Sequence, residues 1–214
     1  MSKQEEILRE IDKKEEKPAE SSYAKHKIVV TEPLEPNELK KTLKDVAQNI
    51  LSLEYKQQHI LNEWLQVWSK YLSFESKFDS RRLVYYKRGD VVLAHFGYNV
   101  GNELGGVHYA VVVERDNNRL SGIVMVVPIS SLEAGKTESD LHKSEVFLGQ
   151  LIDGVEGFAM PLQMRPISKL RIIKPKNKNH GKIIVPGKLL DKIDAKIKLI
   201  FTHSQDGKQT KIDS

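Results

Sequence analysis

The sequence predicts an α+β protein: a long amphipathic helical segment, then a small antiparallel barrel or curled sheet, then one closing helix. Two patterns carry this prediction. Apolar residues follow a helical period over positions 37–74, and short β-branched runs separated by turn residues follow from about residue 85. Closely spaced strands closed by a single helix are typical of a small antiparallel barrel.

The helical segment at 37–74 has a wide apolar face. Spacings of three and four alternate as in a heptad repeat, with Gln57 at the one missed seam position. The main apolar row is Leu39, Leu43, Val46, Ile50, Leu53, Ile60, Trp64, Val67 and Tyr71. Glycine and proline are absent between 37 and 86, so one long helix and a tight helical pair both fit. Such a face should pack on the following domain, on a second copy of the chain or on another protein.

The second half of the chain reads as short strands. Valine-rich runs at 91–96, 109–113 and 122–129 are separated by turn-rich segments at 97–106 and 116–118. Further strands are expected at 144–148, 157–161 and 170–173. A last amphipathic helix should run from Pro186 to about Phe201, because proline suits the first turn of a helix.

These patterns divide the chain into four expected parts. A charged, partly disordered tail covers 1–36, and a helical extension covers 37–80. The barrel domain covers 81–203, and a short tail covers 204–214.

Composition excludes several classes of protein. The 214 residues include no cysteine, which rules out disulfide scaffolds, cysteine nucleophiles and thiolate metal sites. The histidines are scattered without ligand spacing, so we expect no metal site. The N-terminus is charged where a signal peptide is apolar, and no apolar run is long enough to span a bilayer. We therefore expect a cytoplasmic protein that binds no membrane.

The charge is unevenly distributed. Residues 1–80 hold 13 Lys and Arg against 15 Asp and Glu, whereas residues 81–214 hold 21 against 14. An anionic partner should therefore bind the C-terminal part, although a basic surface can also serve solubility alone.

Five segments in the second half carry a family resemblance. They lie at 87–92 (KRGDVV), 101–113 (GNELGGVHYAVVV), 127–131 (VPISS), 157–168 and 181–200. In this order they resemble the MazF/PemK family of toxin endoribonucleases from type II toxin–antitoxin systems. The resemblance covers about half of the chain, and residues 1–80 take no part in it.

This resemblance implies an SH3-like barrel with a C-terminal helix, usually as a homodimer. It also implies cleavage of single-stranded RNA without metal or cofactor, in which the ribose 2′-hydroxyl attacks the adjacent phosphate and leaves a cyclic phosphate and a 5′-hydroxyl. The implied partners are single-stranded RNA, a second copy of the chain and an antitoxin protein.

Two positions are the candidate catalytic residues. The family has an arginine where the glycine loop enters its strand and a threonine in its V-P-x-T strand end; here these places hold His108 and Ser130. An imidazole titrates near pH 6.5 and can exchange a proton, whereas arginine stays protonated. We expect His108 to act in acid–base catalysis and Ser130 to position the phosphate or the leaving oxygen. A histidine that only hydrogen-bonds the loop is the alternative.

A basic track supplies candidate substrate-binding residues. Seven basic residues and no acidic residue occur between 165 and 182, enough to neutralise several phosphates. Gln163 could read a base edge, as amides do for unpaired bases. The expected RNA-binding residues are Asn102, Glu103, Gln163, Arg165, Lys169, Arg171, Lys174 and Lys176.

Two other functions fit the same residues. One is a silent RNA-binding or regulatory module that lost catalysis through the Arg-to-His change. The other is a protein-targeting toxin resembling the gyrase poisons. RNA cleavage in metal-free buffer would separate the nuclease from both.

Overall fold

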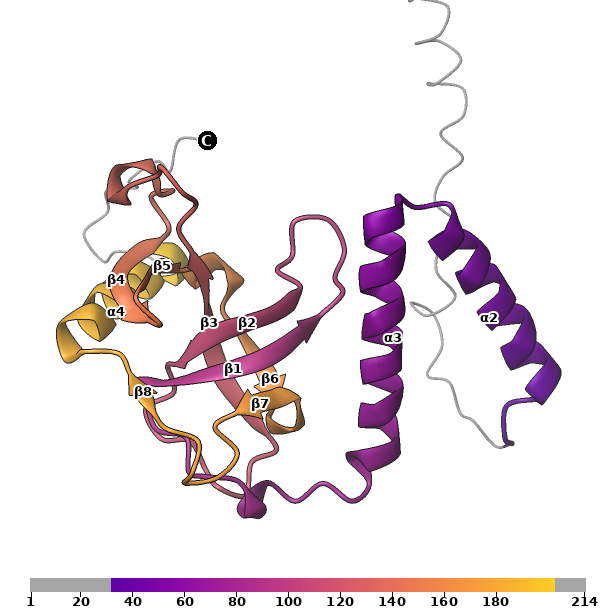
Figure 1. Ribbon diagram of the computed structural model, residues 1–214. Helices are drawn as coiled ribbons and strands as arrows, with labels where there is room; N and C mark the ends of the chain where they lie inside the picture. Colours follow the sequence, from indigo (N-terminus) through magenta and orange to yellow (C-terminus); the bar gives the residue numbers. More distant parts are fainter. Residues whose placement is uncertain (1–31, 203–214) are drawn as a thin grey trace, which may run out of the picture. The chain divides into compact units, whose positions relative to one another are not determined.

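The computed structural model describes residues 32–202, and most of the two tails expected at 1–36 and 204–214 lies outside these residues (Figure 1). The chain divides into two compact units, Met1–Ser52 and Leu53–Ser214. None of the helices in the described range is long and apolar enough to cross a membrane.

The first unit contributes one described helix, α2 (Pro36–Leu51). Pro36 occupies the first turn, where its fixed φ suits a helix start and its missing N–H costs no hydrogen bond. No residue of α2 is buried, and Leu39, Leu43 and Val46 remain exposed. The segment expected at 37–74 is thus two helices, because α2 ends at Leu51 and the next helix begins at Tyr55.

The second unit begins with α3 (Tyr55–Glu75), which packs on the sheet through one face. The Trp64 ring lies so close to Gly97 that a Cβ added there would sit 3.0 Å from Cζ2. Two turns further along α3, the Tyr71 hydroxyl forms a hydrogen bond with His95 Nδ1 at 2.5 Å. The Arg171 guanidinium stacks 5.5 Å from the Trp64 ring centroid. The apolar row of α3 therefore uses Trp64 and Tyr71 to cover the edge of the barrel.

Eight antiparallel strands form one strongly curled sheet (Figure 1). The strands are β1 (Asp90–Gly97), β2 (Gly106–Val112), β3 (Ile123–Ser131), β4 (Val146–Ile152), β5 (Val155–Ala159), β6 (Arg165–Ser168), β7 (Ile172–Lys174) and β8 (Ile183–Ile184). The order is β4-β5-β3-β2-β1-β7, with β6 pairing β3 and β8 pairing β1. β1 pairs with β2, β7 and β8, and β3 pairs with β2, β5 and β6, so these two strands bend across several partners. The predicted fold class is confirmed.

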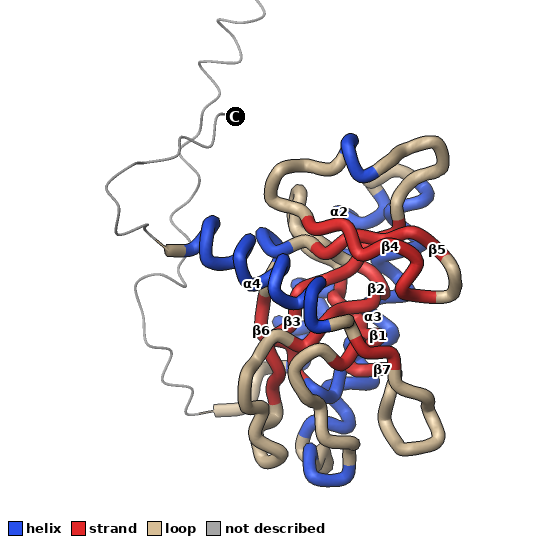
Figure 2. Tube along the Cα trace, turned by 90° about the vertical axis from the view of Figure 1, so that its left-hand side faces the viewer, coloured by secondary structure: helices blue, strands red, loops and turns tan. Residues whose placement is uncertain are grey.

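Side chains alternate across the sheet and fill two cores. Phe96, Ala110 and Val126 belong to the first core, whereas Val111 and Val127 belong to the second. The last helix, α4 (Gly187–Phe201), crosses the sheet (Figure 2). Its residue Ile193 is buried in the second core. The β-branched runs form strands because such side chains pack well on a pleated surface with both faces covered.

The contact between α3 and the barrel should weaken in acid. Burial first, and then the nearby charges of Lys176 and Arg171, lower the pKa of His95. The folded state therefore favours neutral His95. The stabilisation that this gives is complete above about pH 6.5, the pKa of a free imidazole, and is lost as the pH falls toward the lower pKa of His95 in the folded protein. Both tryptophans of the chain, Trp64 and Trp68, lie on α3. Tryptophan emission should therefore shift toward the solvent-exposed wavelength as the pH is lowered below about 6.5.

The matched variant for this prediction is His95→Gln, which retains a hydrogen-bonding side chain facing Tyr71 but has no proton to gain. Its emission should stay flat over the same pH range. An identical transition in this variant would assign the change to another group and would contradict the prediction.

Candidate functional site

The Phe96 ring on β1 lies at the centre of the candidate site. The His108 imidazole, from the neighbouring strand β2, meets it edge-on with ring centroids 6.3 Å apart. The Arg165 guanidinium, from β6, stacks 5.6 Å from the same ring centroid. His108 pairs with Ala94 in the β1–β2 ladder, so its side chain is on the face that carries Phe96 two residues later. The sheet thus brings an imidazole and a permanent cation, 57 residues apart in the sequence, onto one aromatic ring.

The loop at 98–105 closes over this site and is held by amide side chains. Asn99 Nδ2 donates to the carbonyls of Leu104 at 2.6 Å and Phe96 at 3.2 Å. Gln163 Oε1 accepts from Leu104 N at 3.1 Å, and its Nε2 donates to the Asn102 carbonyl at 3.1 Å. The Gln163 amide is therefore engaged with the loop.

Arg165 is tied to the same amide. Its Nη2 donates to Gln163 Oε1 at 2.8 Å, and its Nε donates to the Gln163 carbonyl at 3.4 Å. A chain of contacts consequently links Arg165, Gln163 and the loop that carries Asn102 and Glu103. Both of these loop residues are exposed.

Ser130 lies on β3, beside His108. Tyr109 pairs with Ile129 in the β2–β3 ladder, so His108 and Ser130 are one step further along the same pair of strands. No hydrogen bond joins their side chains within residues 32–202. Ser130 also lines a hollow of about 200 Å3 that contains Tyr109 and Asp153. Burial, followed by the charge and hydrogen bond of Asp153, raises the pKa of the Tyr109 hydroxyl.

The expectation that Lys169 contacts RNA needs correction. Its side chain is 3% exposed, and its ammonium donates to the Asn118 carbonyl at 2.9 Å. Burial lowers the pKa of this amine, while Glu114 acts in the opposite direction. Lys169 therefore braces the β2–β3 turn and does not reach the surface. The charge pattern of the sequence could not show this, because it does not distinguish a buried lysine from an exposed one.

The rest of the basic track is divided between structure and surface. Arg171 is half-buried between the Trp64 ring and the Phe96 carbonyl, to which its Nη1 donates at 3.4 Å. Lys174 and Lys176 are exposed, and no carboxylate pairs with either in the described part of the chain. Among the predicted cations, Arg165 therefore lies on the Phe96 ring that His108 also contacts. Lys174 and Lys176 are exposed to solvent.

Phe96 could not be recognised from the sequence as part of the site. It lies in an ordinary β-branched run, and only the pairing of β1 with β2 and the position of β6 bring His108 and Arg165 to it. Tyr109 on β2 and Asp153 in the β4–β5 turn were missed for a similar reason, because only the folded sheet brings them together. No group of three or more His, Cys, Asp or Glu in the described residues is placed to hold a metal.

Comparison with protein families adds the decisive observation. The sequence model of the PemK-like, MazF-like toxins of type II toxin–antitoxin systems matches residues 87–201, more than half of the chain. The chain belongs to this family. The resemblance inferred from the five sequence segments is therefore confirmed, and His108, Ser130 and Arg165 all lie inside the matched PemK/MazF-like domain.

Known structures give two further likenesses. MazF (Form-I) from Deinococcus radiodurans aligns at 20% identity with a TM-score of 0.38, covering 54% of this chain and 96% of the other. The MazE-MazF complex (Form-II) from the same organism aligns at 19% identity with a TM-score of 0.36, covering 54% and 95%. No curated protein sequence matches the chain.

Proposed function

We propose that this PemK/MazF-like protein is a toxin endoribonuclease that cleaves single-stranded RNA, including mRNA, in the cytoplasm. The observation that carries the proposal is the placement of His108 and Arg165 on one ring, Phe96. Cleavage by 2′-hydroxyl attack needs a group that moves protons and a cation that stabilises the phosphate. His108 and Arg165 supply these two functions separately.

The proposed step balances within the RNA itself. His108 as a neutral imidazole takes the proton of the 2′-hydroxyl while the O2′–P bond forms and the P–O5′ bond breaks. The departing O5′ takes a proton from solvent water, and the protonated His108 returns its own proton to solvent. The products are a 2′,3′-cyclic phosphate and a 5′-hydroxyl. Arg165 stabilises the negative charge that develops on the phosphoryl oxygens, and Ser130 orients the phosphate from the adjacent strand.

Arg165 supplies the permanent positive charge that is missing where His108 replaces the arginine of the family. A histidine at position 108 is a weaker permanent cation than the arginine expected there. In this chain a guanidinium from β6 is held beside it by Gln163. Charge stabilisation and proton transfer are thereby divided between two side chains.

The partners follow from the family. We propose a second copy of the chain and an antitoxin protein as partners, because the matched family consists of toxins of type II toxin–antitoxin systems. The exposed loop residues Asn102 and Glu103 and the exposed cations Lys174 and Lys176 would contact the RNA strand.

Chelation provides the first test. RNA cleavage should continue in excess EDTA, since the proposed step uses only protein groups and the substrate's own hydroxyl. RNA carrying 2′-deoxy at every position should resist cleavage, and the product should carry a cyclic phosphate by mass spectrometry. Activity that EDTA abolishes and Mg²⁺ restores would overturn the proposed mechanism. RNA binding with no cleavage would instead identify a silent module.

A further inference from the structure

A basic pocket lies where the segment at 81–87, the β2–β3 turn and the loop at 175–182 converge. It encloses about 600 Å3, within the range of ligand-binding pockets. Its seven cationic residues are Arg81, Arg82, Lys87, Arg119, Lys176, Lys178 and Lys182. Of the residues around Phe96 described above, none lines it. The family match begins at residue 87, so Arg81, Arg82 and Tyr85 lie outside the matched domain.

Specific hydrogen bonds join the walls of this pocket. The buried Tyr86 hydroxyl donates to the Pro175 carbonyl at 2.7 Å, which ties the segment at 81–87 to the loop at 175–182. Lys182 Nζ donates to the carboxylate of Asp90 at 2.6 Å and to the Tyr85 carbonyl at 3.3 Å. These hydrogen bonds hold the walls of the pocket together, so the pocket is part of the folded barrel.

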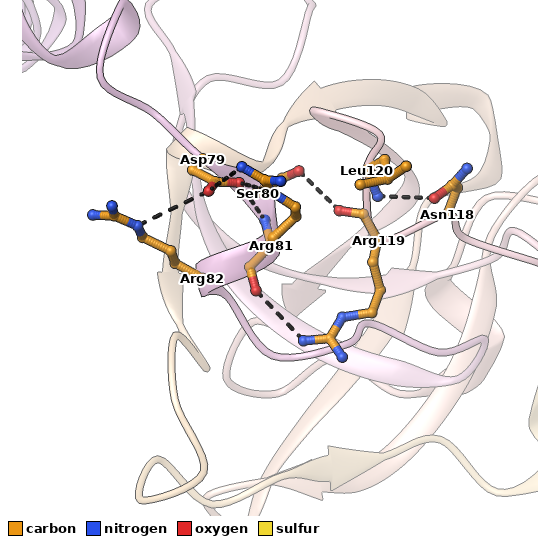
Figure 3. A network of polar contacts seen from close by, with 7 residues as sticks. All are labelled: Asp79, Ser80, Arg81, Arg82, Asn118, Arg119 and Leu120. Atoms are coloured by element: carbon orange, nitrogen blue, oxygen red, sulfur yellow. Dashed lines mark hydrogen bonds and ion pairs between the residues drawn. The ribbon is translucent and has the colours of Figure 1, made fainter.

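The β2–β3 turn is held equally firmly. Ser80 Oγ donates to the Arg119 carbonyl at 2.8 Å, and Arg119 Nη2 donates to the Arg81 carbonyl at 3.4 Å (Figure 3). The buried Lys169 holds the carbonyl of Asn118, the residue before Arg119. The buried Lys169 ammonium therefore helps to position Arg119, which lines the pocket.

Positive charge in the pocket exceeds the available carboxylates. Asp79 forms a forked pair with Arg81, at 2.8 and 2.9 Å, and a longer contact with Arg82 (Figure 3). Asp90 pairs with Lys182. The remaining cations have no carboxylate partner within residues 32–202; they are Lys87, Arg119, Lys176 and Lys178. Uncompensated cations at such density attract a polyanion.

An aromatic ring lies beside these cations. Tyr85 is 37% exposed, and Lys87 Nζ lies 6.0 Å from its ring centroid. Cations that follow a backbone, together with an exposed aromatic face on which a base can stack, are the features of single-strand nucleic-acid sites. An acidic protein segment would use the cations but would gain little from the ring.

We propose that this pocket is a second binding site for single-stranded RNA, separate from the site around Phe96. Lys87, Arg119 and Lys178 contact phosphates, Tyr85 stacks on a base, and Lys176 lies between this pocket's strand and the strand at the first site. The choice of RNA as ligand rests on the proposed ribonuclease function, but binding to the pocket does not require cleavage. The pocket increases the affinity for RNAs long enough to reach both sites.

A binding assay on the full-length protein tests this proposal. The probe is a fluorescent single-stranded 2′-O-methyl RNA, which cannot be cut because its 2′-oxygens are blocked. The triple variant Lys87→Gln/Arg119→Gln/Lys178→Gln should bind it about tenfold more weakly or worse at low salt. The slope of log affinity against log salt should fall by roughly 2, about 0.7 for each lost phosphate contact. Tyr85→Leu should weaken binding about tenfold without changing the salt slope, since it removes a stacking surface and no charge.

A matched triple variant, Lys188→Gln/Lys192→Gln/Lys198→Gln, removes the same charge from exposed positions on α4. It should leave both affinity and slope nearly unchanged. If the pocket variant behaves like this control, the pocket is only solvated surface and the proposal fails. If poly-glutamate binds as tightly as the RNA and Tyr85→Leu has no effect, the pocket takes an acidic protein segment and the proposal again fails. Pocket-dependent RNA binding by a protein that never cleaves RNA would refute the proposed nuclease alone.

Discussion

Replacing His108 with alanine should lower the rate of RNA cleavage on the order of 10²-fold or more, because the proton-transfer group is lost. The side chain is half-buried at the start of β2 and touches the edge of Phe96. The two cores of the barrel are built by other residues, so thermal unfolding should change little. Single-turnover cleavage of a labelled RNA, measured beside a thermal melt, separates a chemical defect from a folding defect.

His108→Arg is the sharper variant, because it places the expected family residue beside Arg165. Two guanidiniums on one ring would repel each other and supply no base, so we expect cleavage to stay far below that of the native protein. An arginine variant as active as the native protein would show that position 108 only stabilises charge.

Replacing Gly105 with alanine should also cause a large loss. A Cβ at this position would lie 2.7 Å from the Gly97 carbonyl oxygen and 3.6 Å from Asn99 N. Both neighbours are backbone atoms, so the loop at 98–105 must move. Overpacking of this kind costs about 1–3 kcal/mol. The displaced loop would lose its bonds to Gln163, and Arg165 would lose its support, so cleavage should fall about tenfold or more.

Gly122→Ala is the matched control, because open space surrounds a Cβ there. It should leave both the melting temperature and the cleavage rate close to native values. If Gly105→Ala cleaves RNA at the native rate, the loop at 98–105 does not organise the site, and the prediction is contradicted.

Much of the barrel follows from local patterns in the sequence. The valine-rich runs became β1, β2 and β3, and the apolar helix at the C-terminus became α4. The strand β6 was absent from the strand prediction because Pro166 and the polar residues around it have a weak strand signal. The break between α2 and α3 was also invisible, since neither glycine nor proline marks it.

The site was less predictable than the fold. The matching loop and strand directed attention to His108 and Ser130, and the structure places them on adjacent strands. The basic track was identified by charge alone, which cannot distinguish an exposed lysine from Lys169, whose ammonium is enclosed. Contacts such as Arg165 on Phe96 join residues far apart in the sequence, and no local spacing encodes them.

The enclosed ammonium of Lys169 has a practical consequence for chemical footprinting. Reagents that acylate amines will label the exposed Lys174, Lys176 and Lys178, and bound RNA should shield whichever of these it covers. Burial lowers the pKa of Lys169 and so favours the reactive neutral amine, yet no reagent reaches it while the barrel is closed. Labelling at Lys169 therefore reports opening of the barrel. It can serve as an internal control for unfolding in each footprinting experiment.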